Sequence, residues 1–185
     1  MKRIVLIFAL LFAPGVFAQE APKPSTFHRL LVFNSQSELM VVKVKNSDRW
    51  VTPGWYQDGK LSIRQGLDAL AGTYGVTIEK PVLRGVFTLQ DGQGELSTRL
   101  IYNTKITGGT LNPPEIIDEI RWLPVPQAID AITFPHITAQ IAQITRYPET
   151  VWGGFQRMHQ DGDKQAVKII EPFYPLATSA LTPSP

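Results

Sequence analysis

The chain has 185 residues and contains no cysteine, which excludes a cysteine nucleophile, a disulfide-dependent fold and lipid attachment through cysteine. Its basic residues form no block, so there is no electrostatic basis for nucleic-acid binding and we expect no such partner. There is no G-x-S-x-G motif, which leaves a serine hydrolase of that type unsupported. No apolar run in the sequence, including residues 4–13, is long enough to cross a membrane.

The first 18 residues have the three-part pattern of a secretory signal peptide. Lys2 and Arg3 form a basic start, residues 4–13 are apolar, and residues 16–18 read Val-Phe-Ala before the expected cleavage point. The apolar run is shorter than the roughly 20 residues of a membrane-spanning helix, which favours cleavage over an uncleaved anchor. We therefore expect a bacterial periplasmic or secreted protein with no stable membrane span after cleavage.

The net charge of the expected mature chain is close to zero. The formal charge of +2 comes from Lys2 and Arg3, and sixteen basic and sixteen acidic residues remain without them. The pI of about 8.9 therefore does not indicate an acidic partner. Cleavage after Ala18 leaves 167 residues, enough for one domain with a substantial core.

The hydrophobic pattern predicts an α+β chain. Strands or extended runs are expected over residues 27–33, 39–44, 82–89, 96–107, 116–125, 151–159 and 164–172. Helices are expected over residues 63–74, 127–132 and 137–144. The expected organisation is a signal peptide (1–18), a flexible lead-in (19–26), a main domain (27–145), a C-terminal extension (146–177) and a disordered tail (178–185).

The first helix carries the clearest local signals. Ser62 is expected to cap its start, because a serine hydroxyl accepts a hydrogen bond from a free helix N–H. Gly75 is expected to end it in the left-handed conformation. Four apolar residues share one face by helical spacing, namely Ile63, Leu67, Leu70 and Ala71. Gly66 and Gly72 each cost the helix about 1 kcal/mol relative to alanine, so this helix depends on packing.

Three stretches together resemble the Nudix hydrolase family over about residues 27–144. They are residues 50–54 (Trp-Val-Thr-Pro-Gly), the helix that ends in residues 74–76 (Tyr-Gly-Val), and residues 119–125 (Glu-Ile-Arg-Trp-Leu-Pro-Val). The resemblance implies a Nudix-like α/β/α sandwich with a mixed β-sheet. The residues that follow are expected to add a C-terminal β-hairpin extension.

The catalytic motif of that family is degenerate in this chain. The Nudix box reads G-x5-E-x7-R-E-U-x-E-E-x-G-U, and its glutamates bind the divalent cations that polarise a diphosphate and activate water. Counting back from residues 75–76, the box positions hold Lys60, Asp68, Ala69, Gly72 and Thr73, with Trp55 in place of the second glycine of Pro-Gly-Gly. We therefore expect no metal cofactor and loss of metal-dependent hydrolysis, which leaves open whether the protein is an enzyme or a pseudoenzyme.

The remaining candidates for a metal site are weak. Asp68 and Glu119 are the best of them, although an exposed carboxylate is the default for such residues. Glu115 and Asp118 lie near Glu119, but strand alternation places successive side chains on opposite faces. Three further residues, His28, His136 and His159, show no metal-ligand spacing. Residues 91–95 and 161–163 resemble calcium loops but are better explained as hairpin turns.

Trp50, Trp55 and Tyr56 flank the loop that borders the substrate in Nudix enzymes, so they are candidate ligand-binding residues, with core packing as the other interpretation. Two functions follow. The first is a Nudix-like protein that binds a small molecule or an envelope protein. The alternative is a divergent hydrolase that cleaves a nucleoside diphosphate-linked or related substrate with Mg²⁺ or Mn²⁺, using Asp68 and Glu119. A purely structural role in an envelope complex is a third possibility.

Overall fold

The structure is a computed structural model that describes residues 25–178. The predicted signal peptide and most of the predicted lead-in and tail lie outside these residues. Ser25 and Thr26 belong to the first strand and Thr178 to the last, so the boundaries predicted at residues 26 and 178 were wrong. Their strand partners are Ser97, Thr98 and Thr150. Pairing with other strands extends the first and the last strand beyond the limits that the local sequence predicts.

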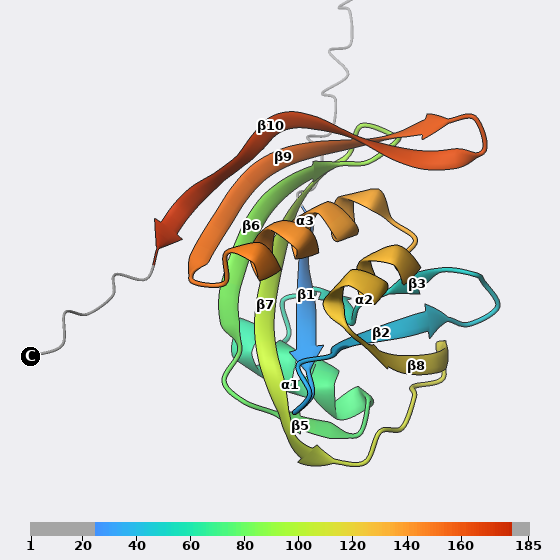
Figure 1. Cartoon of the computed structure of the whole chain (residues 1–185), viewed down its shortest axis with the longest axis vertical. Coiled ribbons are helices and arrows are strands. Elements are labelled where there is room, and N and C mark those ends of the chain that lie inside the picture. The colour runs from blue at the N-terminus through green and yellow to red at the C-terminus, as the bar shows by residue number, and fades with distance from the viewer. Residues whose placement is uncertain (1–24, 179–185) are drawn as a thin grey trace, which may run out of the picture.

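Thirteen elements follow one another in the described chain (Figure 1). In order they are β1 (Ser25–Phe33), β2 (Leu39–Val44), β3 (Trp50–Val51), β4 (Gly54–Tyr56), α1 (Ile63–Thr73), β5 (Val76–Ile78), β6 (Val82–Gln90), β7 (Leu96–Gly109), β8 (Ile117–Leu123), α2 (Val125–Ala131), α3 (Pro135–Arg146), β9 (Thr150–Asp161) and β10 (Lys164–Thr178).

The sheet is mixed, as predicted. Strand β1 pairs in parallel with β7 over nine residues, β7 pairs antiparallel with β6, and β6 pairs in parallel with β9. On the other side of β1 lie β4 and β2, and β2 continues to β8 and β3. The hairpin of β9 and β10 was predicted as an extension, and it widens this same sheet rather than forming a separate layer.

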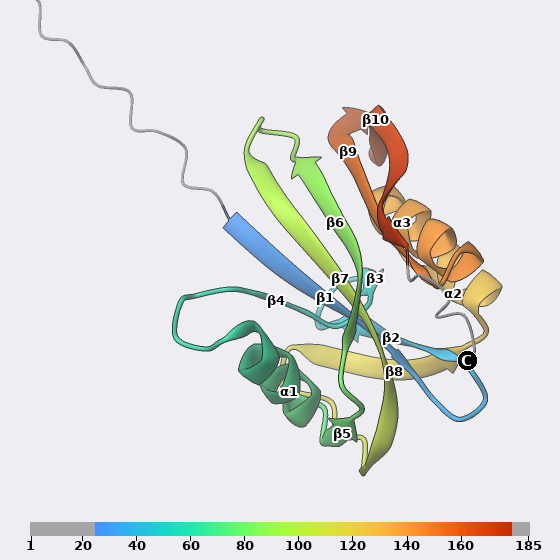
Figure 2. The same cartoon turned by 90° about the vertical axis from the view of Figure 1, so that its left-hand side faces the viewer.

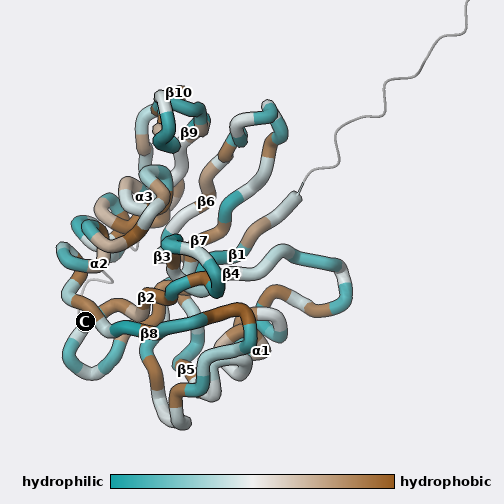
Figure 3. Tube along the Cα trace, turned by 90° about the vertical axis from the view of Figure 1, so that its right-hand side faces the viewer, coloured by the Kyte–Doolittle hydropathy of each residue, from teal (hydrophilic) through white to brown (hydrophobic). Residues whose placement is uncertain are grey.

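Helices cover both faces of the sheet, which confirms the predicted α/β/α sandwich. Figure 2 shows α1 and β5 on one side of the strands and α2 and α3 on the other. The first core lies under α1 and includes Leu30, Met40 and Val42. The second lies under α2 and α3 and includes Leu31, Leu39 and Val41. Because both faces are covered, β2 has a continuous apolar run, drawn brown in Figure 3, instead of an alternating pattern.

Local signals set both ends of α1. The Ser62 hydroxyl accepts a hydrogen bond from the Gln65 N–H at 3.3 Å, and the Gln65 side chain accepts one from the Ser62 N–H at 3.0 Å. This is a complete capping box. Gly75 has a φ of 74°, as its predicted role requires. Ile63 was predicted to share the apolar face of α1, but it is 39% exposed, like the two residues that follow it.

Within residues 25–178, no helix is long and apolar enough to cross a membrane.

Candidate functional site

A pocket of about 300 Å³ lies beside α1, at the positions of the degenerate Nudix box. It is bordered by β4, by one side of α1 and by the segment that leads into β8. Its lining residues are Gly54, Trp55, Leu61, Gly66, Ala69, Leu70, Thr73, Tyr74, Pro114 and Ile116. None of them carries a carboxylate or a basic group. Ala69 and Thr73 occupy two of the positions at which the family places glutamates.

Trp55 forms one wall of this pocket, and it is held from two sides. Its indole stacks on His28, with ring centroids 4.7 Å apart and an interplanar angle of 25°. Its six-membered ring also lies so close to Gly66 that a Cβ atom there would overlap it. Because Gly66 has no side chain, the indole fits between β1 and α1. Trp55, which stands at the second glycine position of the family's loop, is therefore part of the packed structure.

His28 supports the indole from the sheet side. It is fully buried, and its Nε2 lies 3.1 Å from the side-chain oxygen of Gln57. Burial lowers the pKa of His28, and the hydrogen bond to Gln57 only partly opposes this shift. A neutral imidazole stacked on an indole is an apolar support. It adds no charge to the pocket, and His28 itself is not one of the lining residues.

The two carboxylates predicted as metal candidates do not line the pocket. An Asp68 oxygen accepts a hydrogen bond from the Arg64 Nε at 2.7 Å, one turn earlier on α1. A Glu119 oxygen accepts one from the Arg121 Nε at 2.6 Å. Over residues 25–178, no group of three or more histidine, aspartate or glutamate side chains is placed to hold a metal ion. The donor set on this face therefore does not fit Mg²⁺ or Mn²⁺.

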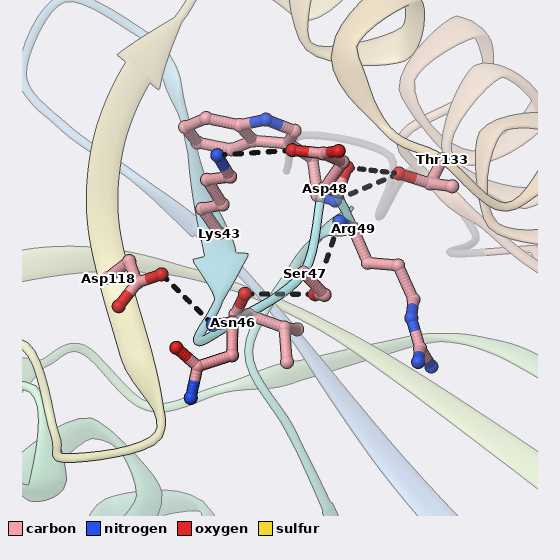
Figure 4. Close-up of polar contacts among 9 residues, drawn as sticks. Lys43, Asn46, Ser47, Asp48, Arg49, Asp118 and Thr133 are labelled. Atoms are coloured by element: carbon pink, nitrogen blue, oxygen red, sulfur yellow. Dashed lines mark hydrogen bonds and ion pairs between the residues drawn. The ribbon is translucent and has the colours of Figure 1, made fainter.

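An acidic residue at the start of β8 holds a turn in place. Figure 4 shows Asp118 directed toward the turn between β2 and β3, where it accepts a hydrogen bond from the Asn46 N–H at 3.1 Å. Lys43 and Asp48 pair across the same turn at 3.4 Å. Glu119, the next residue, bonds to Arg121 instead. The predicted divergence of neighbouring carboxylates is confirmed, and Asp118 has a structural partner.

The three aromatic candidates are separated by the fold. Pairing between β1 and β4 places Trp55 opposite His28 and Tyr56 opposite Phe27, so the two rings lie on opposite faces of the sheet. Trp50 packs at the edge of the second core, with the Arg121 guanidinium carbon 4.4 Å from its ring centroid. Of the three, Trp55 alone lines the pocket.

Sequence reasoning missed part of the pocket because no strand was predicted over residues 53–60. The short strand β4 lies within that segment. A strand there predicts alternation of Trp55 and Tyr56, which a loop does not. Leu61, Pro114 and Ile116 were not singled out either, although they contribute much of the apolar lining. Pro114 and Ile116 could have been found in the sequence as apolar residues within a stretch rich in glycine and proline.

The sequence matches no family model and no curated protein. Solved structures, however, are similar in fold. A MutT protein from Bacillus halodurans has a TM-score of 0.63 at 14% identity, over 80% of this chain and 99% of that one. A Nudix hydrolase from Nitrosomonas europaea gives 0.56 at 14%, over 66% and 70%. A C. elegans Ap4A hydrolase gives 0.53 at 10%, over 66% and 97%. The described chain therefore has the Nudix hydrolase fold, as its motifs predicted.

Proposed function

We propose that this Nudix-fold protein binds a small, largely apolar molecule in the pocket beside α1 and has lost metal-dependent diphosphate hydrolysis. The observation that carries the proposal is the pocket lining, which has no carboxylate even at the box positions Ala69 and Thr73. Magnesium sites in proteins normally include at least one or two carboxylates. The Thr73 hydroxyl donates to the Leu70 carbonyl at 2.7 Å, so its proton is already engaged within the helix.

The shape of the pocket favours a small molecule as the occupant. A volume of about 300 Å³ lies at the lower end of the range for small-molecule sites, roughly 300–1,000 Å³. The Trp55 indole offers a rigid apolar wall, and Leu61 and Ile116 add apolar surface that is 39% and 69% exposed. Such a site fits a flat or aliphatic molecule of about one ring system. Export of the protein, which the signal pattern predicts, would place this ligand in the cell envelope or outside the cell.

The alternative function is a divergent hydrolase of diphosphate-linked substrates. Its support is the fold, shared with structures described as a UDP-X diphosphatase and an ADP-ribose pyrophosphatase. This function requires Asp68 and Glu119 to leave their arginine partners and bind Mg²⁺ or Mn²⁺. The two proposals make opposite predictions for metal binding.

Calorimetric titration of the purified protein with Mg²⁺ and Mn²⁺ tests this directly. We expect no saturable heat up to millimolar metal, because the pocket offers no carboxylate ligand. We also expect no turnover of ADP-ribose or Ap4A with either metal. The hydrolase alternative predicts saturable binding that is lost in both Asp68→Asn and Glu119→Gln. That pattern, in folded variants, would overturn the proposal.

Ligand binding at the pocket is tested with a fluorescent apolar probe, anilinonaphthalene sulfonate. Ala69 is an exposed lining residue of α1, and Ala69→Leu fills the pocket with a good helix former. We expect this substitution to weaken probe binding at least tenfold. The matched control is Gln127→Leu, which adds the same side chain to α2 on the opposite face of the sheet. Equal probe affinity in both variants would place the binding elsewhere.

A further inference from the structure

A buried positive charge lies on the face of the sheet opposite the pocket. Arg29, on β1, is only 6% exposed. Its Nη1 donates to the Thr52 carbonyl at 3.2 Å and to the Thr52 hydroxyl at 2.9 Å. Both acceptors are neutral, and no ion pair joins Arg29 to a carboxylate within residues 25–178. A buried charge without a counter-charge is costly, so its retention calls for an explanation.

A second arginine lies beside it and also lacks an acidic partner in the described chain. The guanidinium carbons of Arg29 and Arg99 lie 5.1 and 4.9 Å from the centroid of the Phe27 ring. Arg99 donates to the Tyr56 hydroxyl at 3.3 Å and to the Ser97 hydroxyl at 3.0 Å. The two cations therefore share one aromatic ring and bond only to neutral groups. Repulsion from Arg99 adds to burial in lowering the pKa of Arg29 to about 9, and Arg29 is still charged at neutral pH.

The start of α3 lies on the same face of the sheet as this cluster. His136, in the first turn of α3, is 6% exposed, and its Nδ1 has no hydrogen-bond partner in the described part of the chain. Burial, Arg29 and Arg99 together lower the pKa of His136 to about 3, so the imidazole is neutral. Phe134 precedes the helix and gives it no side-chain cap. Pro135 has no N–H and the Ile137 N–H donates to the Phe134 carbonyl at 3.0 Å, so this helix start contributes partial positive charge rather than a set of free donors.

We propose that Arg29, Arg99 and the start of α3 form a binding site for an oxyanion, the carboxylate or phosphate group of a small molecule. Arg29 and Arg99 are its binding groups, because guanidinium donors match the paired oxygens of either anion. Half-buried Phe27 lies against both guanidinium groups, and exposed Tyr56 lies against that of Arg99. The site lies on the other face of the sheet from Trp55, so it stands whether or not the apolar pocket binds a ligand.

The test measures thermal unfolding and calorimetric binding with inorganic phosphate and, separately, with acetate, at ionic strength matched with sodium chloride. Comparing the two anions distinguishes a phosphate from a carboxylate ligand. A ligand at a hundred times its Kd stabilises the folded state measurably, so we expect a saturable rise of several degrees in unfolding temperature. Arg29→Met and Arg99→Met should weaken binding at least tenfold. Arg121→Met is the control, because that arginine already bonds to Glu119.

Unfolding temperatures measured in anion-free buffer distinguish a binding role of Arg29 from a structural role. Arg29→Met removes an uncompensated buried charge, so its unfolding temperature should equal or exceed that of the wild type. A lower unfolding temperature, with no anion effect in the wild type, would make Arg29 structural and overturn the proposal. Glu20, the one acidic residue outside residues 25–178, gives the last comparison. Phosphate binding that appears only in Glu20→Gln would assign the site to the chain's own carboxylate and overturn the small-molecule ligand.

Discussion

Replacing His136 with glutamine is expected to remove a large part of the acid lability of this protein. His136 is buried beside two arginines, and its pKa falls from 6.5 to about 3 in the folded state. As the pH falls below 6.5, the unfolded chain takes up a proton at this residue and the folded chain does not. Stability is therefore complete above pH 6.5 and lost progressively toward pH 3, by about 3 kcal/mol at pH 4.

Urea denaturation at pH 7, 5.5 and 4 measures this loss. His136→Gln should lose about 3 kcal/mol less than the wild type between pH 7 and pH 4, because glutamine does not titrate. His159→Gln is the matched control, since it makes the same substitution at a histidine that is exposed on β9. His28, whose pKa is also lowered, continues to contribute in all three proteins. Parallel pH profiles for His136→Gln and the wild type would mean that the imidazole is not buried beside the two arginines.

The limits of α1 were predictable from sequence because the signals that set them are local. Ser62 and Gln65 lie three residues apart and cap each other's backbone, and Gly75 supplies the positive φ immediately after the helix. The absence of box glutamates also follows from counting along the chain. Each of these inferences compares residues within one turn or one motif, where spacing fixes geometry.

The faces on which side chains lie were harder to predict, since they depend on pairing between distant segments. Tyr56 and Trp55 diverge because β4 pairs with β1, which lies before β2 and β3 in the chain. Arg29 was passed over because arginine is seldom buried. Arg29 is buried where β1 pairs in parallel with β7, and it donates to Thr52, which lies 23 residues later in the chain. His136 appeared in the sequence only as one of three scattered histidines, for the same reason.

The indole of Trp55, which forms one wall of the proposed pocket, packs closely against Gly66 of α1. The sequence shows that Trp55 replaces a glycine of the family's loop and that Gly66 weakens the helix. It does not show that these two features fit each other. Together they explain why α1 tolerates a glycine near its start, where the ring needs the space.

Two alanine substitutions in α1 are therefore expected to have opposite effects. Gly72 is exposed, and a methyl group added there would meet open space, so Gly72→Ala should stabilise the protein by about 0.5–1 kcal/mol through helix propensity. At Gly66 the added methyl would overlap the Trp55 ring, and His28 on the far side prevents the ring from retreating. Overpacking of this kind costs about 1–3 kcal/mol. Gly66→Ala should therefore be destabilising, despite the same gain in propensity.

Urea denaturation of the two variants, followed by near-ultraviolet circular dichroism of the tryptophans, gives the comparison. We expect the free energies of unfolding to differ by about 2 kcal/mol, with Gly66→Ala the less stable and altered in its aromatic signal. Both variants carry the same glycine-to-alanine substitution on the same helix. The difference between their free energies of unfolding therefore measures the contact with the indole. If both variants gained stability equally, Trp55 would be free to move away from Gly66. The pocket would then lack its rigid wall, and the proposed binding of a small, largely apolar molecule there would fail with it.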